Sequence, residues 1–270
     1  MRFRHILAFV ALITAPLSGI AQNRPFVGGE QLTFAVCYRA KLVPKTAVGK
    51  ATLDLQTIEH NGKAHYQVVA NGRTLPFFRW FFDLNDTYTS LIDSTTMLPT
   101  SLNIALREDK YTFDADFDYD WSAKKVNTIY KKGSWGKART KSIALEYDHR
   151  DPVAMFYKLR NIDPSTYTLD KPVDVHMVLE DTVRVITYTY LGRDTIKLKH
   201  IGDVPSHKFT CTIATSGVET FKDGTSFFVW LSDDENRIPL WVESPIRVGS
   251  VLAYLTDYKN LRAKLRTVPK

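Results

Sequence analysis

The sequence contains none of the short motifs that mark the common enzyme classes. It has no G-x-S-x-G nucleophile elbow, no phosphate-binding loop and no glycine-rich dinucleotide-binding turn. Its seven histidines show no H-x-x-x-H spacing, and none lies at zinc-site spacing from a cysteine. We therefore expect no catalytic residues, no metal site and no cofactor. A triad assembled from residues distant in the sequence stays open, because triads are recognised in space.

Cysteine is scarce as well. Cys37 and Cys211 are the only two, and both lie in segments with a strand-like pattern. An exported chain is permitted a disulfide, but a bridge needs Cα atoms within about 7 Å. The sequence leaves both a bridge and two buried thiols open.

The chain also lacks a dense basic block of the kind that binds nucleic acid. Its formal net charge is +7, and the lysines and arginines are spread along the chain apart from one basic stretch. Nucleic-acid-binding proteins gather such residues on one face. We therefore expect no nucleic-acid partner and at most a weak attraction to anionic surfaces.

Long apolar runs are missing except at the N-terminus. There Arg2 and Arg4 precede the run ILAFVALITAPLSGI, and Gly19 and Ala21 put small residues at the positions that a signal peptidase reads. This pattern predicts a signal peptide over residues 1–21 and a mature chain of 22–270 that is periplasmic or secreted. An N-terminal membrane anchor is the alternative, but the run is short for a span. No later stretch predicts a transmembrane segment.

What the sequence does contain is a repeated strand pattern. Segments rich in β-branched and aromatic residues alternate polar with apolar side chains, and turn signals such as Asn61-Gly62 and Asp223-Gly224 separate them. Strands and helices do not alternate, which argues against a doubly wound α/β fold. The pattern predicts a mainly β protein, with a large curved antiparallel sheet, an open barrel or a sandwich.

One segment, DPVAMFYKLRNIDP, predicts a helix near the middle of the chain. Asp151 can cap it and Pro152 suits the first helical position. We expect the helix at about 152–162, packed on the sheet by Val153 and Phe156. It would connect an N-terminal strand group at about 30–146 to a C-terminal group at about 165–268, all within one domain.

The strand Phe113–Trp121 carries a row of acids. Asp114, Asp116, Asp118 and Asp120 share one face, which resembles the D-x-D-x-D start of a calcium loop. That loop needs a glycine at its sixth position and a glutamate at its twelfth, where this chain has Tyr119 and Lys125. We predict a solvated face paired with lysines of the next strand, not a metal site.

Two other segments stand out. The aromatic segment from Thr74 to Phe82 is expected to be a buried strand or a loop that plugs one end of a barrel. WLSDDENRIPLWVES, from Trp230 to Ser244, predicts a β-hairpin in which Arg237 pairs with Asp233 or Asp234. Polar and aromatic residues here and in two other segments are the candidate ligand-binding residues: Asp86, Tyr88, Ser90, Tyr157, Arg160, Trp230, Asp233 and Arg237.

Four segments together resemble one protein family. They are GEQLTFAVCY, DTYTSLIDSTTMLPTSLNIALREDKY, DPVAMFYKLR and VWLSDDENRIPLWVESPIRVGSVLAYL. In this order and spacing they are similar to the exported bacterial proteins grouped as domain of unknown function 3108. The resemblance implies an exported, mostly antiparallel β protein, and it supplies no catalytic residues.

Three functions stay open on these observations. The first is a non-enzymatic binding or carrier protein that shelters an apolar, amphipathic or lipid-like envelope ligand in a curved sheet. The second is an envelope scaffold or assembly protein that docks another protein through a sheet edge or exposed aromatic side chains. The third is a hydrolase that acts on envelope polymers.

Overall fold

The computed structural model describes residues 24–40, 43–146, 148–179, 182–213, 226–245 and 249–269. The predicted signal peptide, residues 1–21, lies outside the described residues. Strands dominate, as the alternating sequence pattern predicts. They are β1 (Gln31–Ala40), β2 (Val43–His60), β3 (Lys63–Thr74), β4 (Asn85–Asp93), β5 (Pro99–Glu108), β6 (Tyr111–Asp120), β7 (Lys125–Lys132), β8 (Arg139–Ala144), β9 (Pro172–Leu179), β10 (Thr182–Leu198), β11 (Gly202–Ile213), β12 (Ser226–Ser232), β13 (Pro239–Pro245) and β14 (Ser250–Lys259).

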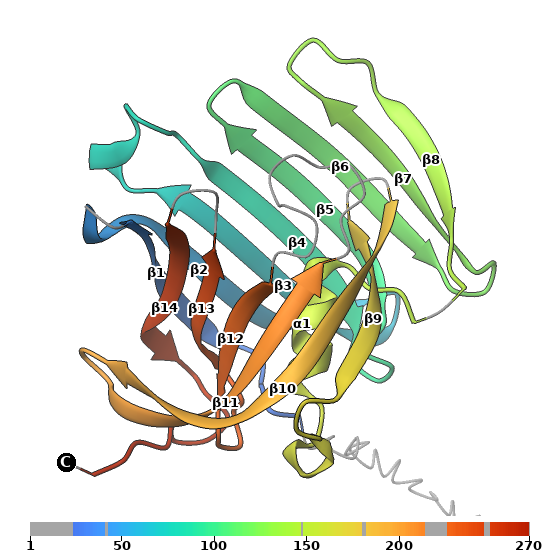
Figure 1. The fold of residues 1–270 in the computed structure, drawn as a ribbon. Coiled ribbons are helices and arrows are strands. Elements are labelled where there is room, and N and C mark those ends of the chain that lie inside the picture. Colours follow the sequence, from blue (N-terminus) through green and yellow to red (C-terminus); the bar gives the residue numbers. More distant parts are fainter. Residues whose placement is uncertain are drawn as a thin grey trace, which may run out of the picture.

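All fourteen strands form one antiparallel sheet in the order β8-β7-β6-β5-β4-β3-β2-β1-β14-β13-β12-β11-β10-β9. The chain starts at the middle of the sheet, moves outward from β1 to β8, and crosses to the opposite edge at β9. It then returns inward until β14 pairs with β1. This connectivity confirms the prediction of a large curved antiparallel sheet with one helix between two strand groups (Figure 1).

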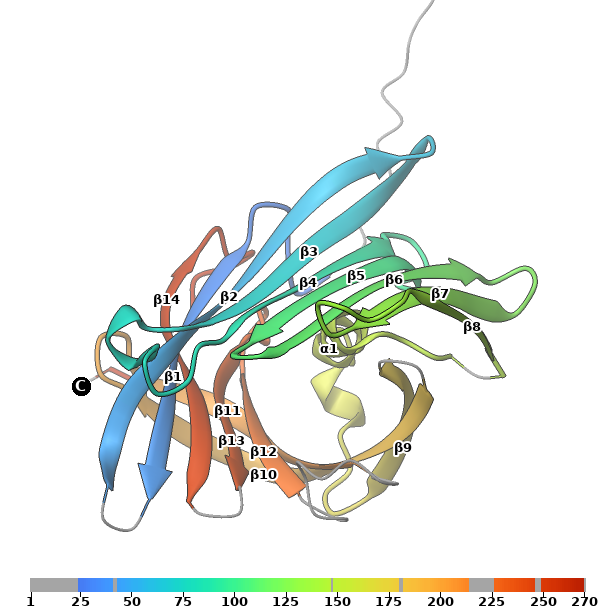
Figure 2. The ribbon, with the colours of Figure 1, turned by 90° about the horizontal axis from the view of Figure 1, so that it is seen from above.

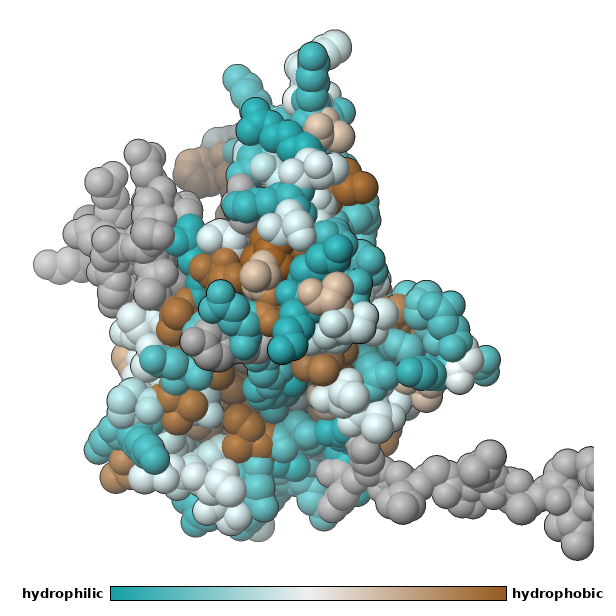
Figure 3. All heavy atoms as spheres, turned by 90° about the vertical axis from the view of Figure 1, so that its right-hand side faces the viewer, coloured by the Kyte–Doolittle hydropathy of each residue, from teal (hydrophilic) through white to brown (hydrophobic). Residues whose placement is uncertain are grey.

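The sheet curls strongly but does not close, because its edge strands β8 and β9 do not pair with each other. The segment before the helix bridges part of the gap: the Arg150 amide donates to the His176 carbonyl oxygen at 3.2 Å, and the Val178 amide donates to that of Arg150 at 2.8 Å. Figure 3 views the molecule from the side of β8 and β9 and shows apolar side chains between polar ones on this face.

Long strands with bulges produce the curl. β2 has 18 residues and β10 has 17, and both change register along their length. In β10 the register against β11 shifts between Tyr190 and Gly192, and Gly192 has a φ of 101° that favours glycine. A bulge of this kind bends the strand and increases its twist. The sheet can therefore wrap around a central space.

The one α-helix among the described residues, α1 (Pro152–Arg160), lies inside the curve of the sheet (Figure 2). The Asp151 carboxylate accepts hydrogen bonds from the amides of Val153 and Ala154, both at 2.8 Å, as an N-cap does. The helix ends two residues before the predicted end, because its last turn tightens: the Asn161 amide donates to the Lys158 carbonyl oxygen at 3.0 Å and the Ile162 amide to that of Leu159 at 3.3 Å. Two short 3₁₀ turns, η1 (Pro76–Phe78) and η2 (Pro164–Thr166), complete the described elements.

The core consists of side chains on the concave side of the sheet. One cluster joins α1 to β2, β3 and β4, where Val153 and Tyr157 pack against Leu55, Val68 and Ile92. Val153 is buried and Phe156 is partly buried against this cluster, so both predicted anchors of the helix contact the sheet. A second cluster covers β5, β6 and β7, and a third lies between β1, β13, β14 and the β10–β11 turn. None of the helices in the described residues is long and apolar enough to cross a membrane.

The acidic strand is β6, and its carboxylates lie on the face opposite the core. Asp114 pairs in register with Lys131 and Asp120 with Lys125, while Asp116 faces Ile129 and accepts a hydrogen bond from the Asn103 amide at 2.8 Å. Two of the four acids therefore face lysines, as predicted. No cluster of three or more metal-ligating side chains occurs in the described part of the chain.

The prediction for Thr74–Phe82 is wrong. The segment is neither a buried strand nor a plug: β3 ends at Thr74, and the rest forms η1 and an exposed turn. Phe77, Trp80 and Phe81 are 75%, 81% and 78% exposed. The run of aromatic residues suggested burial, but Pro76 stops the strand ladder because it has no amide hydrogen to donate.

Candidate functional site

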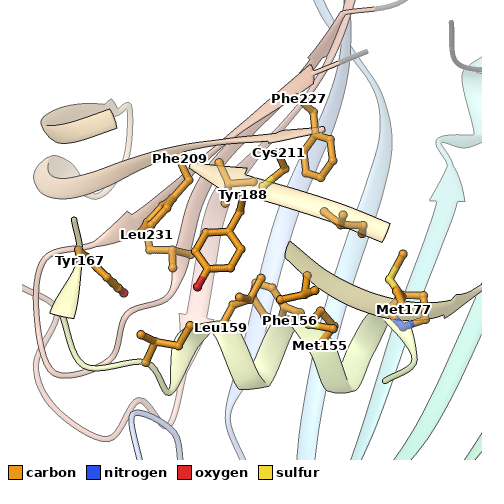
Figure 4. A pocket seen from close by; sticks show the side chains of 15 residues that line it. Met155, Phe156, Leu159, Tyr167, Met177, Tyr188, Phe209, Cys211, Phe227 and Leu231 are labelled. Carbon is orange, nitrogen blue, oxygen red and sulfur yellow. The ribbon is translucent and has the colours of Figure 1, made fainter. Parts of the chain in front are cut away.

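An apolar cavity of about 280 Å³ lies between α1 and strands β9 to β12. Figure 4 shows Met155, Phe156 and Leu159 on the face of α1 that is turned toward the strands. Leu159 lies one turn after Met155 and Phe156, which places the three side chains on one side of the helix. The helix therefore forms one wall of the cavity and the curved sheet forms the other.

Period-two alternation supplies the strand wall. Successive side chains leave a strand on opposite faces, so every second residue points into the cavity. The residues that do so are Val175 and Met177 of β9, Ile186 and Tyr188 of β10, Phe209 and Cys211 of β11, and Phe227, Val229 and Leu231 of β12. Fifteen residues line the cavity in all, and none of them carries a charge.

The few polar side-chain groups of the cavity are neutral at pH 7. Burial raises the pKa of the Tyr167 hydroxyl to about 12 and that of the Cys211 thiol to about 12, and it also raises the pKa of Tyr188. An apolar space that offers water so few hydrogen-bond partners holds water poorly. The cavity is therefore suited to an apolar chain and unsuited to an ion.

A smaller, more polar hollow of about 110 Å³ adjoins the cavity. It shares Tyr167, Tyr188 and Phe209 with the cavity, and adds Lys171 and Tyr190. Thr166 and Thr168 also line it. The two spaces together form a site with an apolar part and a polar end, and the ammonium group of Lys171 is the cation at that end.

A hydrogen-bonded network of Tyr190, His207 and Asp233 adjoins the polar end of the site. The Nδ1 of His207 lies 3.1 Å from the Tyr190 hydroxyl, and its Nε2 lies 2.9 Å from a carboxylate oxygen of Asp233. The Tyr167 ring packs edge-on against the imidazole at 5.2 Å. Burial lowers the pKa of His207, although Asp233 opposes this effect. Burial also raises the pKa of Tyr190, so this hydroxyl keeps its proton at neutral pH and is suited to donating a hydrogen bond.

The predicted ligand-binding residues lie elsewhere. None of the eight lines the cavity. Arg160 and Tyr157 are fully buried beside Glu30, and the Ser90 hydroxyl donates to the buried Asp151 carboxylate at 2.8 Å. Asp86 accepts a hydrogen bond from the Arg107 amide at 2.9 Å. Tyr88, partly buried, packs between two core clusters.

The three candidates of the β12–β13 hairpin also make contacts within the protein. Trp230 points to the face opposite the cavity because it alternates with Val229 and Leu231, and its indole nitrogen donates to Asp194 at 2.8 Å. The Arg237 guanidinium donates to the Ile162 carbonyl oxygen at 2.6 Å. The sequence had predicted that it would pair with Asp233 or Asp234 within the hairpin.

Asp234 organises the turn of this hairpin. Its carboxylate accepts hydrogen bonds from the amides of Asn236 and Arg237, at 2.9 and 3.2 Å. Asp233 instead contacts His207, and its second oxygen lies 3.5 Å from the Arg193 guanidinium. A ligand-binding role for the eight candidates stays a prediction.

The cavity residues cannot be recognised in the sequence, because a strand residue that faces a cavity has the same alternation as one that faces a filled core. The only signal was aromatic density in the segments KFTCTI and SFFVWLS, together with the face of α1 that carries Phe156 and Leu159. Which of these side chains leave a space depends on the distance between α1 and the sheet, and local sequence does not set that distance.

The comparisons with known proteins concern the fold. The model of a family described as protein of unknown function, DUF3108, matches residues 33–256. A crystal structure of a beta-barrel-like protein of domain of unknown function DUF1849 from Brucella abortus is similar to the chain, with a TM-score of 0.57 at 12% sequence identity. The match covers 87% of this chain and 98% of that one. Among the curated proteins there is no match. The likeness shows a shared fold.

Proposed function

This chain belongs to the DUF3108 family of proteins of unknown function, and we propose that it is a non-enzymatic binding or carrier protein for a ligand with an apolar chain. One observation carries the proposal: the curved sheet and α1 line a cavity whose fifteen lining residues include no charge. Pockets of this kind hold small molecules by burying their apolar surface.

The energetics are adequate for reversible binding. Burial contributes roughly 0.8 kcal/mol for each methylene group, so a chain of about ten methylenes gains roughly 8 kcal/mol. Lost translational and rotational freedom offsets part of this gain. We therefore expect dissociation constants of micromolar or above for simple single-chain ligands. A carrier needs binding of this strength, because it must also release its ligand.

The polar hollow favours an amphipathic ligand over a hydrocarbon. Lys171 and the hydroxyl of Tyr188 adjoin the end of the apolar cavity, where a head group attached to a buried chain would lie. Donors of this kind fix the orientation of a ligand whose affinity comes from apolar contact. Single-chain amphiphiles with a carboxylate or phosphate head group fit both parts of the site.

The proposed location is outside the cytoplasm. The N-terminal pattern of basic residues, apolar run and small residues supports export, and a ligand of this class is abundant in a cell envelope. Mass spectrometry of the protein from its producing cells would then give a mature chain that begins at Gln22. A chain that retains residues 1–21 would contradict export with cleavage.

A displacement assay tests binding directly. The purified protein is titrated with a fluorescent fatty-acid probe, and the probe is then displaced with single-chain alcohols and carboxylates of increasing length. We expect saturable binding that strengthens with chain length up to the limit of the cavity. Cys211→Phe places a ring in the cavity and should abolish binding, whereas Val268→Phe, at an exposed C-terminal site, should not. Equal probe binding by both variants would refute the cavity as the site.

A further inference from the structure

Three neighbouring turns lie at one end of the sheet, and the first and third of them carry exposed aromatic side chains. They connect β3 to β4 (residues 75–84), β5 to β6 (109–110) and β7 to β8 (133–138). Because successive strands of an antiparallel sheet run in opposite directions, these alternate connections lie at the same end, along the upper left edge of the sheet in Figure 1. The first two turns touch: the Asp83 amide donates to the Asp109 carboxylate at 2.8 Å, and Leu84 bridges to Glu108. We call these three turns the aromatic rim.

The exposure of these side chains is unusual for their type. Phe77, Trp80 and Phe81 of the first turn are 75%, 81% and 78% exposed, and Trp135 of the third turn is 99% exposed. Scattered exposed apolar residues are normal on a protein surface, whereas several large aromatic residues gathered at one end mark an interaction site. Within the first turn Phe77 packs edge-on against Phe78, and Trp80 packs edge-on against Phe81, so these rings contact neighbours in the same turn.

The charge around Trp135 indicates the kind of partner. Residues 121–145 contain no aspartate or glutamate, and basic residues flank the β7–β8 turn on both sides. They are Lys131, Lys132, Lys137, Arg139 and Lys141, of which Lys131 faces Asp114 across the β6–β7 pair. Lys137 and Arg139 are exposed. In the first turn Arg79 lies 3.5 Å from Asp83, so its charge is offset there.

We propose that the aromatic rim docks on the surface of an anionic lipid bilayer. Tryptophan and phenylalanine side chains favour the zone between head groups and acyl chains, and lysine and arginine beside them attract anionic head groups. The rim consists of separate protruding turns and not of a groove, so it suits a fluid surface that can surround each side chain. Docking in this way would bring the protein to a source of lipid, but the inference stands without the cavity.

Vesicle sedimentation tests this proposal. The purified protein is sedimented with vesicles of phosphatidylcholine alone and with vesicles in which half of the lipid is phosphatidylglycerol. We expect binding to the anionic vesicles, weaker binding to the neutral ones, and a loss of binding as salt is raised. The double variant Trp80→Ser/Phe81→Ser and the single variant Trp135→Ser should each weaken binding, and Lys137→Glu/Arg139→Glu should weaken it by about tenfold.

Matched controls lie away from the rim. Val268→Ser removes an exposed apolar side chain near the C-terminus, and Lys197→Glu/Lys199→Glu reverses two exposed charges at the β10–β11 turn. Both controls should sediment like the unchanged protein. All the substituted rim side chains are exposed, so the variants should keep the unfolding transition of the unchanged protein. Absence of vesicle binding, equal binding to both lipids, or equal losses in rim and control variants would overturn the proposal.

Discussion

Arg160 and Glu30 form a bidentate ion pair in which both side chains are fully buried. The two guanidinium nitrogens donate to the two carboxylate oxygens at 2.6 and 2.9 Å, and one of them also donates to the Asn236 carbonyl oxygen at 2.9 Å. The Tyr157 hydroxyl lies 3.5 Å from the same carboxylate. The carboxylate raises the pKa of Arg160 against the effect of burial. The pair therefore ties the end of α1, one wall of the cavity, to the segment before β1 and to the β12–β13 hairpin.

Breaking this pair on one side should destabilise the protein strongly. Glu30→Gln leaves the buried guanidinium without a counter-charge, so the free energy of unfolding should fall by about 3–5 kcal/mol in urea unfolding. The double variant Glu30→Leu/Arg160→Leu removes both charges, and its free energy of unfolding should fall by less than that of Glu30→Gln alone. If the loss of unfolding free energy in the double variant equals the sum of the losses in Glu30→Leu and in Arg160→Leu, the two side chains do not couple these elements.

Asp151 should make stability depend on pH between about 4 and 6. Burial raises the pKa of this carboxyl from 3.8 to about 6 in the folded protein. In this range the folded protein holds a proton that the unfolded chain has released, so the free energy of unfolding falls as pH rises. Relative to Asp151→Asn, which keeps a capping oxygen, the free energy of unfolding of the unchanged protein should fall by roughly 2 kcal/mol between pH 4 and pH 7 in urea unfolding.

Asp163→Asn provides the control for this pH effect. Asp163 accepts a hydrogen bond from the Ser165 amide at 2.9 Å, and its pKa is lowered by the bonds that it makes there. Its contribution to stability should therefore be lost as pH falls below about 4, in the opposite direction to that of Asp151. The same pH dependence in Asp151→Asn and in the unchanged protein would contradict the raised pKa.

Both cysteines should be free thiols that react slowly in the folded protein. Cys37 on β1 and Cys211 on β11 are buried and unbridged, with three strands between them in the sheet. Burial raises the pKa of both thiols, that of Cys211 to about 12, so little thiolate is present at pH 8. Titration with a thiol reagent should find two thiols in denaturant without reductant. Finding none would indicate a disulfide.

Lys171 should favour ligands with an anionic head group. Lys171→Gln keeps a polar side chain at the polar hollow but removes its charge, so affinity for a long-chain carboxylate should fall by about threefold to tenfold. Affinity for the alcohol of the same chain length should not change. Lys197→Gln, on the β10–β11 turn, is the matched control. If Lys171→Gln loses as much affinity for the alcohol as for the carboxylate, Lys171 does not bind the head group.

The sequence predicts much of this fold, because its strongest signals are local. Alternation marks the strands, and Asp151 with Pro152 marks the start of the helix. Spatial arrangement was harder to foresee. Nothing in the sequence indicated that Arg160 would form an ion pair with Glu30, 130 residues away, or that β8 and β9 would be the opposite edges of one sheet.

The candidate residues illustrate the same limit. Polar and aromatic residues were chosen because binding sites need them, and the protein uses Arg160, Ser90 and Trp230 for internal hydrogen bonds. The aromatic run from Phe77 to Phe82 was expected inside and lies outside. Side-chain type alone does not distinguish a partner within the chain from a partner outside it.

Native mass spectrometry of the protein purified from its producing cells tests the carrier proposal most directly. The account predicts a bound species that gentle ionisation retains, that organic extraction releases as a single-chain or lipid-like amphiphile, and that is absent from Cys211→Phe but present on Val268→Phe. A protein that carries no such species in repeated gentle preparations, and that binds no apolar chain offered to it, would contradict the account.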